Sequence, residues 1–79
     1  MIGLEITKGD LETQVNGTNR ILEITKDKYY LVEKNNKFAY CKPLTTGFEN
    51  IFGGYIPARE LYLQIVAYNR GILEGRHSR

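Results

Sequence analysis

The strongest pattern of apolar and polar residues lies between Pro57 and Leu73 and has the period of an amphipathic helix. Its apolar residues fall on one arc, and most of its charged residues fall on the opposite side. The arc consists of Leu61, Tyr62, Ile65, Val66, Tyr68, Ile72 and Leu73. Pro57 suits the first helical turn, where its missing N–H needs no partner. We therefore predict a helix that covers a core and that either ends at Gly71 or runs to about Gly75.

Alternation of apolar and polar residues, the period of a strand with one buried face, occupies the first half of the chain. Turn-forming residues interrupt it, and the pair Asn16-Gly17 is the strongest hairpin signal among them. The predicted strands are Ile2 to Thr7, Leu11 to Val15, Leu22 to Thr25, Tyr29 to Lys34 and Lys37 to Lys42, with turns at 9–10, 16–17, 27–28 and 35–36. The pattern predicts five strands joined as an antiparallel meander.

The register of this meander is consistent with one buried face, because opposed residues in antiparallel strands point to the same side. The predicted pairs include Leu4 with Val15, Ile24 with Leu31, and Leu31 with Tyr40. The buried face holds Ile2, Leu4, Ile6, Leu11, Val15, Leu22, Ile24, Tyr29, Leu31, Phe38 and Tyr40. The predicted fold is α+β, an antiparallel β-meander of about five strands with one C-terminal helix packed on one face.

The opposite face of the predicted sheet changes character along the chain. In the first three strands it carries polar residues, namely Glu5, Thr7, Glu12, Gln14, Glu23 and Thr25. In the last two strands it carries Tyr30, Val32, Ala39 and Cys41. The long connection that follows holds Phe48, Ile51, Phe52 and Tyr55, and it is either a tucked crossover or a binding loop with partly exposed aromatic residues.

The length of 79 residues predicts a single α+β domain over residues 1–75, followed by a short, frayed basic tail at residues 76–79. A domain this small buries little surface, so self-association is expected to stabilise it. The size is also typical of phage and mobile-element proteins.

No apolar run approaches the roughly 18 residues that cross a bilayer, and the first residues lack the pattern of a secretory signal. The single cysteine, Cys41, forms no internal disulfide, which fits a reducing compartment. We expect a soluble cytoplasmic protein with no membrane partner.

Few residues in the chain are suited to catalysis or to metal binding. His77 is the only histidine and lies near the C-terminus, so Cys41 has no anchored histidine to activate it. One histidine and one cysteine supply no plausible ligand set for zinc. Gly53-Gly54 lacks the spacing of a phosphate-binding motif. We expect a protein that is not an enzyme and needs no metal or other cofactor.

A protein interaction is the function that the apolar surfaces favour. The apolar second sheet face, the aromatic loop and the outer side of the helix each offer area to bury against a partner. The candidate contact residues are Tyr30, Val32, Ala39, Cys41, Phe48, Phe52 and Leu63. We expect a homodimer through the second sheet face, or a binder or inhibitor of another protein.

Binding of single-stranded nucleic acid is the alternative. Residues 26–42 carry five lysines, and a ring on the outer sheet face can stack a base while lysines contact phosphates. The candidate residues are Lys26, Lys28, Tyr30, Lys34, Lys37 and Lys42. Against this alternative, the same sheet face is predicted to carry Glu5, Glu12 and Glu23, which repel phosphate.

Overall fold

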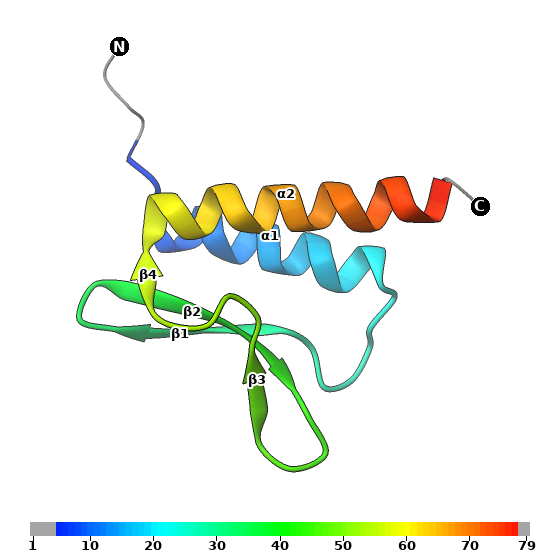
Figure 1. The fold of residues 1–79 in the computed structure, drawn as a ribbon, viewed down its shortest axis with the longest axis horizontal. Helices are drawn as coiled ribbons and strands as arrows, with labels where there is room; N and C mark the ends of the chain where they lie inside the picture. Colours follow the sequence, from blue (N-terminus) through cyan, green and yellow to red (C-terminus); the bar gives the residue numbers. More distant parts are fainter. Residues whose placement is uncertain (1–4, 78–79) are drawn as a thin grey trace.

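The computed structural model describes residues 5–77, which form two helices and four strands (Figure 1). In chain order the elements are α1 (Lys8–Ile21), β1 (Tyr30–Lys34), β2 (Lys37–Pro43), β3 (Phe48–Asn50), β4 (Ile56–Pro57) and α2 (Ala58–His77). The strands form one antiparallel sheet. The two helices lie side by side, run in the same direction and pack on one side of that sheet (Figure 1). We call this the helix side, and the opposite side the outer face.

Helix α1 occupies a segment where the alternating pattern predicts a strand and a hairpin. A capping box starts the helix: the Thr7 hydroxyl accepts a 3.2 Å bond from the Asp10 amide, and the Asp10 carboxylate accepts a 2.9 Å bond from the Thr7 amide. Leu11, Val15 and Thr18 then recur at helical spacing and are buried. The predicted five-stranded meander with a single helix is therefore wrong. The chain is an α+β protein whose described region has a helix at each end.

The predicted hairpin at Asn16-Gly17 lies inside α1, at the contact between the helices. A Cβ atom at Gly17 would lie 3.7 Å from Nδ2 of Asn69, a buried residue of α2. The Asn69 side chain donates to the Gln14 carbonyl at 3.1 Å and accepts a hydrogen bond from the Thr18 hydroxyl. This polar network lies between the helices, and Gly17 is a helical residue rather than part of a turn.

A loop without strands connects α1 to β1, so the predicted strand Leu22–Thr25 is also wrong. The predicted pairing of Ile24 with Leu31 fails for the same reason. Ile24 instead packs, half-buried, against the core. The predicted pairing of Leu4 with Val15 fails because Val15 is helical. Of the predicted strand Ile2 to Thr7, residues 2–4 lie outside the described region and residues 5–7 form no strand.

Strands β1 and β2 form the hairpin that the sequence predicts around Asn35-Asn36. Both asparagines have positive φ, 51° and 62°, as the tight hairpin turn requires. The register pairs Leu31 with Tyr40 and confirms the predicted pairing of these two residues.

Strands β3 and β4 pair with opposite ends of β2. Between them, the Ile51 amide donates a 2.8 Å hydrogen bond to the Tyr40 carbonyl. Phe52 stacks on Tyr40, with ring centres 5.6 Å apart. The middle of the connection between residues 43 and 56 is therefore tucked against the sheet, whereas Phe48 and Tyr55 are exposed, so each of the two predicted alternatives describes part of it.

The core lies between the sheet and the two helices. Its buried members are Leu11, Val15, Tyr29, Phe38, Tyr40, Leu61 and Ile65. Helix α2 contributes Leu61 and Ile65 to it as predicted, and continues through Gly71. Leu73 is 42% exposed, so its predicted place on the core-facing arc is wrong. Residues 78–79 of the predicted tail lie outside the described residues.

Neither helix of the described region is both long and apolar enough to cross a membrane.

Candidate nucleic-acid interface

The outer face of the sheet is left open by both helices, and the strand register determines which side chains it carries. The alternation along β1 and β2 places on it Tyr30, Val32, Lys34, Lys37, Ala39 and Cys41. β3 adds Phe48, which pairs with Pro43 at the end of β2. Tyr55, immediately before β4, joins this face because its ring lies against Lys34.

Two small residues of β2 form the floor of the outer face. Ala39 is 1% exposed and Cys41 is 0% exposed. Burial raises the pKa of the Cys41 thiol, so the sulfur stays protonated at neutral pH. The sequence predicts both residues as contact residues, but the structure places them beneath their neighbours, where they offer no surface of their own.

Three aromatic side chains surround this floor and are exposed. The exposed fractions are 38% for Tyr30, 55% for Phe48 and 41% for Tyr55. The rings of Tyr30 and Phe48 meet at an angle of 65°, with centres 6.5 Å apart. Part of each ring is thus held by packing, and the rest is available to a ligand.

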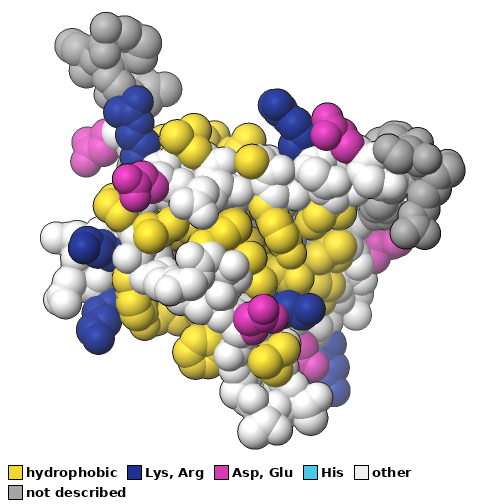
Figure 2. Space-filling model, in the orientation of Figure 1, with side chains coloured by type: hydrophobic (Ala, Val, Ile, Leu, Met, Phe, Trp, Pro, Cys, Tyr) yellow, Lys and Arg dark blue, Asp and Glu magenta, His cyan; other side chains and the backbone are white. Residues whose placement is uncertain are grey.

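Two lysines flank these rings at the hairpin end of the sheet. Lys34 Nζ lies 5.6 Å from the centre of the Tyr55 ring, a cation–π contact. Lys37 is paired with Lys34 in the register and is exposed. In Figure 2, basic side chains project at the left of the molecule, where Figure 1 shows the hairpin turn.

The strands carry no acidic residue on the outer face within the described region. The two glutamates of the strands, Glu33 and Glu49, alternate to the helix side. Glu33 lies 3.7 Å from Lys8 Nζ, and Glu49 lies opposite Lys42 in the strand register. The outer face therefore has a positive charge that neighbouring carboxylates do not neutralise.

The acidic residues that the sequence places on this face lie elsewhere. Glu12 belongs to α1, and Glu23 lies in the turn after α1 with a φ of 57°. Glu5 precedes α1 and is in no strand. Their predicted position on the outer sheet face is wrong, because none of the three lies in a strand. This change removes Glu5 and Glu23 from the outer face and leaves Glu12 near its β1 edge, where Glu12 and Tyr30 line the same groove.

The structure separates the five lysines that the sequence groups together. Only Lys34 and Lys37 lie on the outer face. Lys42 lies on the helix side, where its charge lowers the pKa of Tyr68 slightly against the larger effect of burial. Lys28 lines a separate groove beside the end of α1, and Lys26 is exposed in the loop between α1 and β1.

The remaining predicted contact residues occupy three different environments. Val32 is half-buried on the outer face. Phe52 belongs to the core side, where its ring lies 5.6 Å from that of Tyr40 and 5.9 Å from that of Tyr68. Leu63 is 61% exposed on α2, away from the sheet. The seven predicted residues therefore do not form one surface.

Tyr55 is predicted among the aromatic residues of the long connection, but it is not among the candidate contact residues. Its position follows from β4, a strand of two residues that is too short to give an alternating pattern. Within the described residues, no group of three or more His, Cys, Asp or Glu side chains is placed to hold a metal ion. The interface offers aromatic rings and ammonium groups as its binding chemistry.

Comparison of the chain with protein-family models, with curated proteins and with solved structures gave no match in any of the three. A functional assignment therefore depends on the residues of the outer face.

Proposed function

We propose that the outer face of the sheet binds single-stranded nucleic acid. The observation that carries the proposal is the combination of three exposed rings and two lysines on a face whose strands carry no carboxylate. The rings are Tyr30, Phe48 and Tyr55, and the lysines are Lys34 and Lys37.

Each of these groups matches a part of an unpaired strand. A base stacked on an aromatic ring contributes about 1–3 kcal/mol, with little dependence on sequence. In a duplex the bases are already stacked on each other, so single strands are preferred. Lysine is also depleted in protein–protein interfaces, whereas it is the ordinary contact to phosphate.

The two lysines limit the salt dependence of binding. Each phosphate contact on a single strand contributes about −0.7 to the slope of log affinity against log salt concentration. Two contacts predict a slope of about −1.4, a modest electrostatic contribution, so stacking supplies the rest of the affinity.

The test is fluorescence anisotropy with labelled oligothymidylate and oligouridylate of about ten nucleotides, within the usual range of single-strand site sizes. We expect the double substitution Lys34→Glu with Lys37→Glu to weaken binding at low salt by at least about tenfold, because two attractions to phosphate become repulsions. The matched control is Lys26→Glu with Lys28→Glu, which changes the net charge equally but away from the interface. The control is expected to weaken binding by less than about threefold.

Two outcomes contradict the proposal. One is the absence of binding by the unaltered protein at low salt. The other is an equal loss in the two double variants, which would mean that only net charge attracts the oligonucleotide.

A protein contact is the second candidate, and the exposure of Leu63 on α2 favours it. Homodimerisation through the outer face depends on its rings, because Ala39 and Cys41 are covered. Sedimentation of interface variants at high protein concentration shows which of the two surfaces, α2 or the outer face, forms a dimer. Leu63→Asp dissociates a dimer formed by α2, whereas Tyr30→Ala with Phe48→Ala dissociates one formed by the outer face.

A further inference from the structure

Strand β1 is the open edge of the sheet within the described residues, and the hairpin fixes which of its backbone groups are free. In a two-residue hairpin the flanking residues, Lys34 and Lys37, exchange hydrogen bonds, and every second pair does the same. The backbone groups of Leu31 and Glu33 therefore point away from β2. The same alternation is seen across β2, where the Tyr40 carbonyl accepts from Ile51 on the opposite side.

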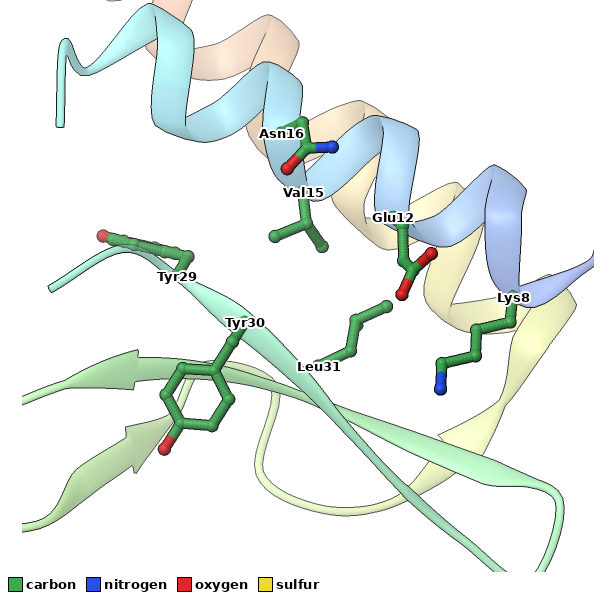
Figure 3. A pocket seen from close by; sticks show the side chains of 7 residues that line it. All are labelled: Lys8, Glu12, Val15, Asn16, Tyr29, Tyr30 and Leu31. Atoms are coloured by element: carbon green, nitrogen blue, oxygen red, sulfur yellow. The ribbon is translucent and has the colours of Figure 1, made fainter. Parts of the chain in front are cut away.

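A groove of about 450 Å³ runs along this edge, between β1 and α1 (Figure 3). Val15 and Leu31 form its apolar floor, and Lys8, Glu12 and Asn16 form its polar rim. Tyr30 also lines the groove, although its ring points to the other side of β1 in Figure 3, so the groove and the outer face meet at this residue. Side chains of a strand added to β1 would enter this groove at every second position.

Among the described residues that line the groove, one carboxylate has no cationic partner. Lys8 is paired with Glu33 at 3.7 Å. The Glu12 carboxylate points into the groove from α1 and is exposed. A ligand strand is therefore favoured when an apolar side chain meets Val15 and Leu31 and the next side chain on the same face is basic.

A second copy of the chain does not suit this edge. Paired strands lie about 4.8 Å apart, whereas an α-helix is about 10–12 Å across. Because α1 lies over β1, two copies joined at β1 would bring their α1 helices into the same space (Figure 3). An extended peptide without a covering helix avoids this overlap.

We propose that the free edge of β1 and the groove below α1 bind an extended peptide of a partner protein by strand addition, with an apolar and a basic residue two positions apart. The backbone groups of Leu31 and Glu33 supply the hydrogen bonds, and Glu12 selects the basic residue. This site borders the outer face at Tyr30, but the proposal does not depend on nucleic-acid binding.

The test uses two synthetic peptides, TVTKTVT and TVTETVT, titrated into the isotopically labelled full chain and followed by NMR. We expect saturable shifts of the Leu31 and Glu33 amide signals with TVTKTVT, and about tenfold weaker binding of TVTETVT. Glu12→Lys is expected to reverse this preference. Glu60→Lys, an equal charge change on α2, is expected to preserve it.

The proposal is overturned if neither peptide shifts the two amide signals up to millimolar concentration, or if Glu12→Lys leaves the preference unchanged. Concentration-dependent self-association with shifts at Leu31 and Glu33 would also overturn it, because a second copy would then occupy the edge.

Discussion

Two side chains, Cys41 on the outer face and Tyr68 on the helix side, can be used to measure how tightly the protein is packed. Cys41 lies at the centre of the outer face with no exposed surface, between residues whose rings remain partly open to solvent. Tyr68 lies on the helix side, where its ring meets that of Tyr40 edge-on at 6.0 Å. The thiol and the phenol are both chemical probes that respond to loss of packing.

The first prediction concerns the reactivity of Cys41. A buried thiol with a raised pKa reacts slowly, because the thiolate is the nucleophile. We expect a disulfide reagent at neutral pH to modify the native protein only as fast as the protein opens. Tyr30→Ala with Phe48→Ala is expected to raise the rate by at least about tenfold through local exposure.

Leu63→Ala, a truncation of an exposed side chain on α2, serves as the control and is expected to leave this rate unchanged. Rapid modification of the unaltered protein would show that the rings do not cover Cys41.

The second prediction concerns stability at alkaline pH. Burial raises the pKa of Tyr68 from 10.0 to about 12, with smaller contributions from Tyr29. The unfolded chain therefore loses the Tyr68 proton at lower pH than the native protein does. The free energy of unfolding is unaffected by this group below about pH 10 and falls as the pH rises from 10 to about 12.

Denaturant unfolding measured across this pH range checks the sign. Tyr68→Phe is expected to reduce the fall, although not to abolish it, because burial also raises the pKa of Tyr40. Identical falls with and without the Tyr68 hydroxyl would contradict the assignment.

At the scale of elements, α1 distinguishes the structure from the strand pattern most clearly. Leu11 and Val15 are four residues apart, a spacing that both a helix and a strand place on one face. The capping box of Thr7 and Asp10, and the burial of Thr18 and Asn19, decide in favour of the helix.

Gly17→Ala gives opposite predictions for the two alternatives. In α1, alanine gains about 0.5–1 kcal/mol over glycine, and its Cβ would make an ordinary contact with Asn69 at 3.7 Å. In an Asn-Gly hairpin turn the same change would destabilise the protein, because alanine disfavours positive φ. We expect the free energy of unfolding to rise, as measured by denaturant titration.

Gly53→Ala is the matched control. Gly53 has a φ of 84° with no atom near the added Cβ, so its substitution tests backbone strain alone and is expected to destabilise. A loss of stability in Gly17→Ala as large as that in Gly53→Ala would argue against α1.

The elements that sequence reasoning identified are those with redundant signals. The β1–β2 hairpin combines alternation with an Asn-Asn turn, and α2 has a long apolar arc. Pro57, which is predicted in the first helical turn, instead ends β4 immediately before α2. The strands predicted for the N-terminal segment are wrong because its apolar residues have a spacing that fits both periods, and because the pair Asn16-Gly17 resembles a hairpin turn. β3 and β4 were missed because strands of three and two residues leave no periodic pattern.

At the scale of the whole molecule, the correction of α1 changes which function is favoured. With Glu12 and Glu23 on the sheet, the lysines of the hairpin would face a partly acidic surface. With these residues in α1 and in the turn after it, the outer face carries exposed rings and two lysines. The candidate interface was thus partly predictable from Tyr30, Lys34 and Lys37, whereas its charge balance required the fold.

The protein then has two binding surfaces with different chemistry. The outer face offers rings and positive charge, and the β1 edge offers backbone hydrogen bonds beside a free carboxylate at Glu12. The two surfaces meet at Tyr30, which belongs to the outer face and also lines the groove.

The most direct test of nucleic-acid binding is an NMR titration of the labelled protein with unlabelled oligouridylate of about ten nucleotides. The account predicts saturable shifts at Tyr30, Phe48 and Tyr55, with side-chain signals of Lys34 affected and the signals of α2 unchanged. Shifts confined to α1 and α2, or none at low salt, would contradict it.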